Sequence, residues 1–145
     1  MMTTLETDLS LTVKRLIPAS PQRVFDAWLD PKKLVQFMVA GAEAGCRFAE
    51  TDPRVGGRYS LTMMIGDREI PHSGTYLEID PHRRIAFTWE PAHAAPGSTV
   101  AIDMAPEGAG TMVTLTHVKF TSEDSRQGHI RGWTWIMDAL EKARL

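Results

Sequence analysis

The chain has 145 residues, of which 43% are hydrophobic and 23% charged, and its 16 basic and 18 acidic side chains leave a net charge of −2. These values describe one soluble globular domain whose core needs no metal or disulfide to hold it together. The near-neutral charge, with no basic run longer than Lys32-Lys33 or Arg83-Arg84, argues against nucleic acid as a partner.

The first predicted elements are a strand and two short helices. Apolar side chains alternate with polar ones between Leu9 and Ile17, as in a half-buried strand. Ser20-Pro21 and Asp30-Pro31 each combine an N-cap residue with a first-turn proline, which predicts a helix start at both places. We expect residues 1–8 to be a flexible N-terminus and residues 9–145 to form a single domain.

The rest of the chain is predicted to be a strand meander followed by one long helix. Period-two alternation predicts strands at 46–50, 58–65, 73–79, 84–90, 99–104 and 112–120. From about Ser122 the apolar period changes to 3.6, which predicts a helix that runs nearly to the C-terminus. This order predicts an α+β fold in which a seven-stranded curved antiparallel sheet wraps around the last helix.

A curled sheet closed by one helix need not fill its own interior, so we expect a cavity between the two. Parity along the strands gives the inward residues, and the same alternation also turns Ile65, Ile79, Ile85 and Val113 inward. The predicted ligand-binding residues are Phe37, Met38, Tyr59, Leu61, Met63, Thr75, Leu77, Phe87, Trp89, Val100, Ile102, Met104, Leu115, His117, Trp133 and Met137. The same pattern fits a filled core, in which no space remains for a ligand.

Two inward polar side chains are weak candidates for catalysis. His117 and Tyr59 could serve as acid and base on an enolisable substrate, although each could equally be satisfied by its neighbours. His72, His82, His93 and His129 lack zinc-ligand spacing, so no metal site is expected. No GxSxG, GxGxxG or GxxxxGK[ST] motif is present, and no cofactor is expected.

Several segments together resemble a known family. They are residues 18–28, 30–31, 52–57, 74–79, 87–89, 114–117 and 132–133. The set resembles the activator of Hsp90 ATPase homologue-like family of the START/SRPBCC superfamily, and the resemblance runs from about Leu9 to Leu145. It implies a helix-grip fold and binding of a hydrophobic ligand, within a superfamily that includes lipid carriers, polyketide cyclases and a co-chaperone domain. The chain departs from many relatives at Phe37-Met38, where they carry an aromatic pair, usually two tryptophans.

These observations lead to three functional hypotheses. The first is binding or carriage of a small hydrophobic molecule in the cavity. The second is a cyclase- or aromatase-like enzyme on a polyketide-type substrate, and the third is a chaperone ATPase co-regulator.

The compartment and the oligomeric state can also be predicted. The lone Cys46, the lack of a signal peptide and the lack of any apolar run of about 20 residues predict a cytoplasmic protein with no membrane span. Trp135 falls on the polar face of the last helix, and it is a candidate contact for a homodimer.

Overall fold

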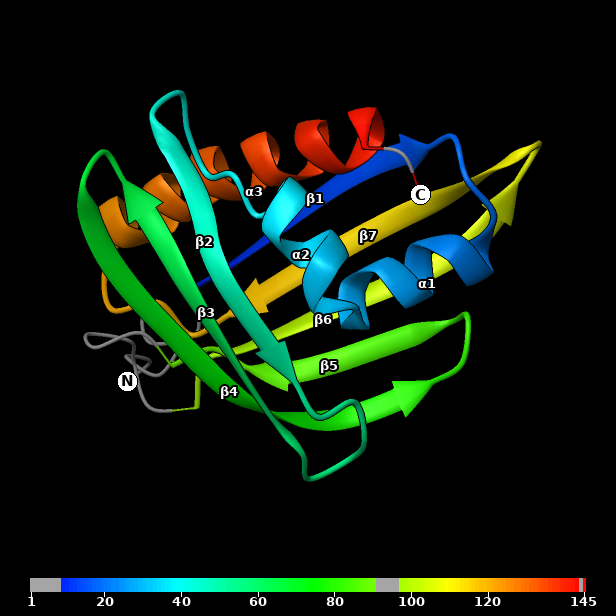
Figure 1. The fold of residues 1–145 in the computed structure, drawn as a ribbon, viewed down its shortest axis with the longest axis horizontal. Coiled ribbons are helices and arrows are strands. Elements are labelled where there is room, and N and C mark those ends of the chain that lie inside the picture. The colour runs from blue at the N-terminus through cyan, green and yellow to red at the C-terminus, as the bar shows by residue number, and fades with distance from the viewer. Residues whose placement is uncertain (1–8, 91–96, 144) are drawn as a thin grey trace, which may run out of the picture.

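The computed structural model describes residues 9–90, 97–143 and 145, so the predicted flexible N-terminus, residues 1–8, lies outside the described residues. Figure 1 shows a curled sheet with helices on its concave side. The elements are β1 (Ser10–Ile17), α1 (Pro21–Leu29), α2 (Pro31–Phe37), β2 (Ala44–Thr51), β3 (Arg58–Ile65), β4 (Arg68–Asp80), β5 (Arg84–Thr88), β6 (Thr99–Glu107), β7 (Gly110–Val118) and α3 (Glu123–Lys142).

The sheet confirms the predicted fold class. Its seven strands follow the order β1-β7-β6-β5-β4-β3-β2, and every neighbouring pair is antiparallel. The half made of β2, β3 and β4 turns over toward α3, while α1 and α2 cover the other end of the concave side (Figure 1). The long C-terminal helix therefore lies in the grip of the sheet, as the residue pattern predicted.

Side chains fix the start of each helix. The hydroxyl of Ser20 accepts a hydrogen bond from the backbone N–H of Arg23 at 3.3 Å, and the Asp30 carboxylate accepts one from Lys32 at 2.9 Å. Ser122 caps α3 in the same way, with the backbone N–H of Ser125 at 3.0 Å. Each cap satisfies a donor that the first helical turn leaves without a partner.

Strand β4 differs most from the prediction. It begins at Arg68 rather than at residue 73, and its pairing with β5 shifts by one residue between Tyr76 and Glu78, where Leu77 is the extra residue of a β-bulge. The bulge reverses the phase of the strand. Gly74 and Tyr76 are therefore buried before it, whereas Ile79 packs against the core after it.

Two predicted inward orientations are wrong for this reason. Leu77 is 48% exposed at the bulge, and Thr75 lies on the outer face of β4, where its hydroxyl accepts a hydrogen bond from Arg58 at 3.0 Å. Ile65, the last residue of β3, lines the concave side as predicted, although it is 55% exposed. The parity rule fails at Leu77 and Thr75 because it assumes an unbroken strand.

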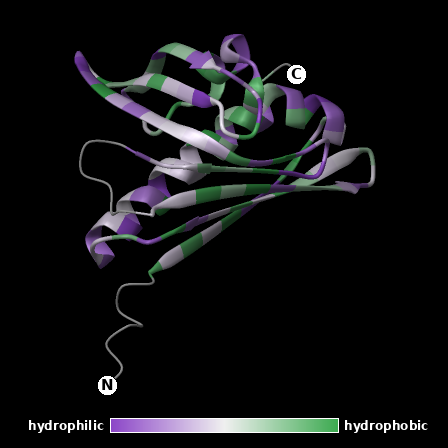
Figure 2. Cartoon of the chain, turned by 90° about the horizontal axis from the view of Figure 1, so that it is seen from below, coloured by the Kyte–Doolittle hydropathy of each residue, from purple (hydrophilic) through white to green (hydrophobic). Residues whose placement is uncertain are grey.

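The core fills most of the concave side. Figure 2 shows hydrophobic and hydrophilic residues alternating along the strands. The buried set includes Phe37, Val100, Ile102, Met104 and Leu115 and, from the second half of α3, Met137 and Leu140. The filled-core alternative is therefore correct for this part of the molecule, and space remains elsewhere.

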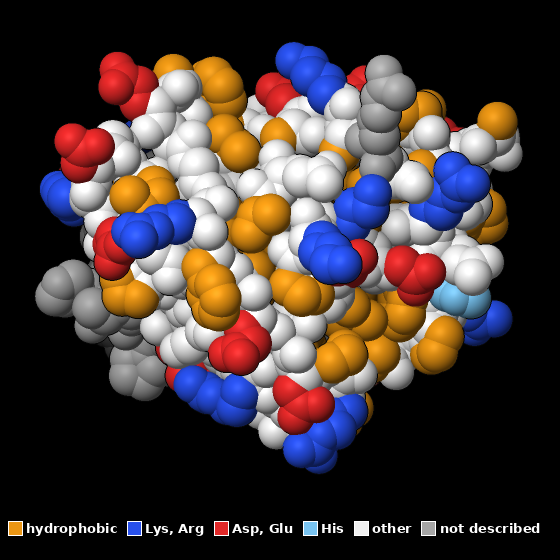
Figure 3. Space-filling model, viewed as in Figure 1, with side chains coloured by type: hydrophobic (Ala, Val, Ile, Leu, Met, Phe, Trp, Pro, Cys, Tyr) orange, Lys and Arg blue, Asp and Glu red, His pale blue; other side chains and the backbone are white. Residues whose placement is uncertain are grey.

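The surface shows no segregation of charge on the face drawn in Figure 3, where acidic and basic side chains are interspersed. Among the described residues, no helix combines the length and apolarity that a membrane span requires.

Candidate functional site

A cavity of about 400 Å³ lies between the β3–β4 hairpin and the first half of α3. Its volume falls within the range of small-molecule sites in proteins. Among the described residues it is lined by Ala40, Ala44, Met63, Met64, Ile65, Ile70, His72, Trp89, Ser125, Gly128, His129, Gly132, Trp133 and Ile136. This lining is apolar and aromatic apart from two histidines, one serine and the tryptophan indole nitrogens.

Small residues on α3 create the space. Ser125, Gly128 and Gly132 line the cavity from successive turns of the helix. A Cβ at Gly128 would meet only the Arg131 guanidinium at 3.9 Å, and one at Gly132 would meet Ala40 at an ordinary 3.6 Å. Close packing therefore does not require either glycine. Each lowers helix stability by about 1 kcal/mol relative to alanine, and the absence of a side chain at each position enlarges the cavity.

The wall between the cavity and the core contains Trp89. Its indole packs against Trp133 with ring centroids 5.0 Å apart and against His72 at 4.7 Å. The Trp89 side chain is buried, and its Nε1–H has no hydrogen-bond partner among the described residues. Buried indole N–H groups usually have a partner, so this donor can bind a polar atom of a ligand or of a water.

A second, much smaller void lies on the other side of Trp89. It measures about 20 Å³, room for about one water molecule, and its lining residues are Trp28, Leu34, Met38, Tyr59, Leu61, Tyr76, Phe87 and Trp89. The Nε1–H of Trp28 is also buried without a hydrogen-bond partner among the described residues. This void is too small for an organic ligand, and it has room for one water beside the Trp28 indole.

Of the described residues that line the large cavity, His72 and His129 are the titratable ones. The Nδ1 atom of His72 donates to the backbone carbonyl of Ile70 at 3.0 Å, and that of His129 donates to the carbonyl of Ser125 at 2.8 Å. Since a carbonyl can only accept, both Nδ1 atoms carry the proton, and in the neutral ring Nε2 is left as an acceptor. Neither Nε2 has a hydrogen-bond partner among the described residues.

Burial lowers the pKa of His72; the hydrogen bond to the Ile70 carbonyl opposes this in part, and the nearby His129 adds a smaller lowering. His72 is therefore a neutral imidazole at pH 7.

His117, the predicted catalytic histidine, is fully buried and lines neither of these two cavities. Its Nδ1 accepts from the Trp133 indole at 3.0 Å, so its Nε2 carries the proton and donates to the hydroxyl of Ser98 at 2.8 Å. Burial, helped by His129, lowers the pKa of His117 to about 3. Both ring nitrogens are thus occupied by protein partners.

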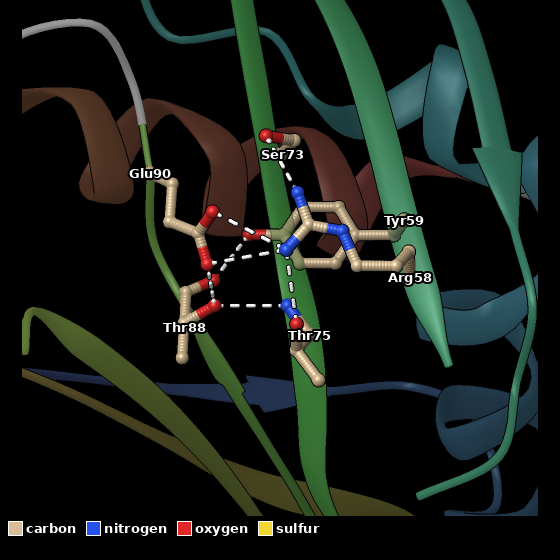
Figure 4. Close-up of polar contacts among 6 residues, drawn as sticks. All are labelled: Arg58, Tyr59, Ser73, Thr75, Thr88 and Glu90. Atoms are coloured by element: carbon tan, nitrogen blue, oxygen red, sulfur yellow. Dashed lines mark hydrogen bonds and ion pairs between the residues drawn. The ribbon is translucent and has the colours of Figure 1, made fainter. Parts of the chain in front are cut away.

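Tyr59 is held equally firmly. Its hydroxyl donates to the backbone carbonyl of Thr88 at 2.6 Å (Figure 4), and both groups lie close to Gly74. A Cβ at Gly74 would lie 2.1 Å from that carbonyl and 2.5 Å from the Tyr59 ring, so glycine is required here. Burial raises the pKa of Tyr59, so the phenol keeps its proton as a donor.

Around Tyr59, polar side chains on the outer face connect β3, β4 and β5. Arg58 donates to Thr75 at 3.0 Å and to Ser73 at 3.4 Å, and it pairs with Glu90 at 3.3 Å (Figure 4). The hydroxyl of Thr88 accepts from the backbone N–H of Thr75 at 2.8 Å. These contacts join β3, β4 and β5 beside the cavity. Tyr59 and Thr75 therefore stabilise the pairing of these strands.

The structure separates the predicted ligand-binding residues into four groups. Met63, Trp89 and Trp133 line the large cavity, while Met38, Tyr59, Leu61 and Phe87 line the small void. Phe37, Val100, Ile102, Met104, Leu115, His117 and Met137 are core residues that line neither, and Thr75 and Leu77 lie on the outer side. Ligand contact by any of them stays a prediction.

Sequence reasoning missed His72, Ser125 and His129. His129 precedes Trp133 by one helical turn and Ile136 by two, so the helical period alone could have placed it on the inner face. His72 shares its parity with Gly74 and Tyr76, and the unrecognised bulge at Leu77 hid that parity.

Two further predictions concern metals and dimers. Within residues 9–90, 97–143 and 145, no three His, Cys, Asp or Glu side chains lie close enough together to hold a metal ion. Trp135 is 45% exposed on α3, as its position on the helix predicted. A dimer contact through Trp135 stays a prediction.

Comparison with known proteins decides the family. Residues 18–144 match the family described as "Activator of Hsp90 ATPase homolog 1-like protein". The chain belongs to this family. A search of curated proteins found no match.

Solved structures agree with this assignment. Protein CV1439 from Chromobacterium violaceum has a TM-score of 0.83 at 25% identity, over 92% of this chain and 94% of that one. The Mll3558 protein from Rhizobium loti has a TM-score of 0.72 at 30% identity, over 93% and 96%. An AHSA1-like protein from Aeromonas hydrophila has a TM-score of 0.79 at 24% identity, over 92% and 90%. The predicted family resemblance is confirmed, and the fold it shares suggests a hydrophobic-ligand-binding domain.

Proposed function

We propose that this protein binds or carries a small hydrophobic molecule in the cavity between the β3–β4 hairpin and the first half of α3. One observation carries the proposal: about 400 Å³ of space has an apolar and aromatic lining with no Lys, Arg, Asp or Glu side chain among the described residues. Sites for small hydrophobic ligands have this character, namely a concave apolar surface with a few polar groups that fix orientation.

The composition of the cavity wall supports the proposal. Met63, Met64 and Trp133 offer polarisable or aromatic surface, and an apolar ligand that covers it gains about 25 cal/mol for each Å² removed from water. Gly128 and Gly132 keep space open at a cost in helix stability that packing does not explain.

A ligand panel with a cavity-filling variant tests the proposal. Fatty acids, sterols and aromatic polyketides are screened by thermal shift, and the purified protein is examined by native mass spectrometry for a bound molecule. In Gly128→Leu the new side chain enters the cavity, since a Cβ there meets only a flexible guanidinium at 3.9 Å. We expect at least one class to raise the melting temperature of the wild type and to lose its affinity at least tenfold in Gly128→Leu.

The matched control is Arg131→Leu, which places the same side chain at an exposed position of α3 outside the cavity lining. It should bind like the wild type. Absence of any bound mass and of any shift across the panel contradicts the proposal, as does a ligand whose affinity is unchanged in Gly128→Leu.

The acid–base alternative gains no support from the positions of its two residues. His117 lines neither of the two cavities and makes two hydrogen bonds within the protein, and Tyr59 donates its proton to a backbone carbonyl. We therefore assign no catalytic step to either residue. The proposal includes a cytoplasmic location, which suits the free thiol of Cys46 and is checked by cell fractionation.

A further inference from the structure

Three polar groups on the wall of the large cavity lack a hydrogen-bond partner among the described residues. They are the Nε2 atoms of His72 and His129 and the Nε1–H of Trp89. His72 and Trp89 are in ring contact, with centroids 4.7 Å apart, so an acceptor-bearing and a donor-bearing ring lie side by side on the same wall. His129 faces the same space from α3.

A hydroxyl group suits one acceptor and the donor of this set. Its proton can be donated to one imidazole Nε2, and its oxygen can accept from the indole N–H. We propose that the ligand of this cavity is a neutral hydrophobic molecule that carries a hydroxyl group, which donates to the imidazole Nε2 of His72 or of His129 and accepts from the indole N–H of Trp89. This inference rests on the proposed function and names the chemical class of its ligand.

An anionic ligand of the same shape fits less well. None of the described lining residues is Lys or Arg, and the Arg131 guanidinium near Gly128 belongs to an exposed side chain outside the lining, so a carboxylate beside His72 and Trp89 would meet no opposite charge on the described lining residues. The lowered pKa of His72 means that this imidazole is neutral at pH 7 and offers an acceptor, which repels a carboxylate oxygen. Burying an unpaired charge costs far more than burying a paired hydroxyl.

A pure hydrocarbon also fits less well. It would cover the two Nε2 atoms and the Trp89 N–H, and it would leave all three without partners in a dry environment. A site built to hydrogen-bond a ligand group discriminates strongly against the analogue that lacks the group. The apolar area of the ligand then supplies affinity, and the hydroxyl supplies selectivity.

Three probes with one carbon skeleton test the inference: naphthalene, 2-naphthol and 2-naphthoate, titrated at pH 7.5 by calorimetry. We expect 2-naphthol to bind about tenfold more tightly than naphthalene, the effect of one net hydrogen bond, and 2-naphthoate to bind more than tenfold more weakly than 2-naphthol. In ¹⁵N-labelled protein, the Trp89 indole signal, assigned with Trp89→Phe, should shift with 2-naphthol and not with naphthalene. The exposed Trp135 should show no shift and serves as the reference.

The double variant His72→Phe with His129→Phe keeps the ring shapes and removes both Nε2 acceptors. It should bind 2-naphthol and naphthalene with about equal affinity. The ratio of the two affinities is measured within one variant, so a general change in stability or cavity shape largely cancels. The control His82→Asn changes an exposed histidine outside the lining and should keep the wild-type preference.

Each outcome decides. Equal or tighter binding of naphthalene or of 2-naphthoate overturns the inference and leaves the proposed function standing, as does a preference that survives in the double variant. Lack of binding by all three probes also overturns the inference, and the proposed function then depends on the panel with Gly128→Leu.

Discussion

His117 should make the protein sensitive to acid. Its pKa falls from 6.5 to about 3 in the folded protein. Between these values the unfolded chain binds a proton that the folded protein does not, so the free energy of unfolding falls as the pH drops below 6.5 and is unaffected above it. pH 5 lies about 1.5 units below the pKa of 6.5 in the unfolded chain. At about 1.36 kcal/mol per unit, the free energy of unfolding is lower by about 2 kcal/mol at pH 5 than at pH 7.

Urea unfolding at pH 7 and pH 5 measures this loss. His117→Gln should be less stable than the wild type at pH 7, because the hydrogen bonds to Ser98 and Trp133 are disturbed, but its further loss between the two pH values should be smaller by about 2 kcal/mol. The control His82→Asn, in the exposed turn between β4 and β5, should keep the full loss. The reasoning is refuted if His117→Gln loses as much stability between pH 7 and pH 5 as the wild type.

Three further predictions concern the backbone and the tautomers. Gly74→Ala should destabilise the protein by about 3 kcal/mol or more in urea, because the new Cβ would lie 2.1 Å from a carbonyl of β5, whereas Gly45→Ala, with nothing within 4 Å, should cost little. Tyr76→Ala should cost about 3–5 kcal/mol and Leu77→Ala no more than about 0.5 kcal/mol, and equal costs would contradict the bulge. Long-range ¹H–¹⁵N spectra should show His72 protonated at Nδ1, and an Nε2–H tautomer would remove its acceptor from the cavity.

The sequence was sufficient to predict the elements and their order, because the signals involved are local. Ser20-Pro21 and Asp30-Pro31 start helices through capping bonds within one turn, and the alternation at 58–65 matches β3 at both ends. The predicted β4 began too late because Pro71 argues against a strand interior. In the structure, residues 68–72 pair with β3 alone among the described residues, so this stretch of β4 is an edge of the sheet, where proline is tolerated.

The cavity itself was placed less well, for reasons that lie in tertiary structure. Parity counted back from Ile79 turned Leu77 and Thr75 inward, and a bulge, which depends on pairing with β5, reverses that phase. The sequence also gave no measure of how far the β3–β4 hairpin stands from α3. The predicted open space beneath the whole helix is filled along its second half, and it persists beside Gly128 and Gly132.

The space between the sheet and α3 is filled unevenly, so the molecule has two parts: a packed scaffold and the large cavity, here called the chamber. Strands β5, β6 and β7 and the second half of α3 supply the densely packed scaffold, whereas the chamber wall is drawn from the hairpin tip and the first turns of α3. Wall positions outside the core cluster, such as Met64 and Gly128, can change with little effect on the scaffold, whereas Trp89 and Trp133 belong to both parts. The ligand preference of this architecture can therefore change through the first set of positions while the fold is kept.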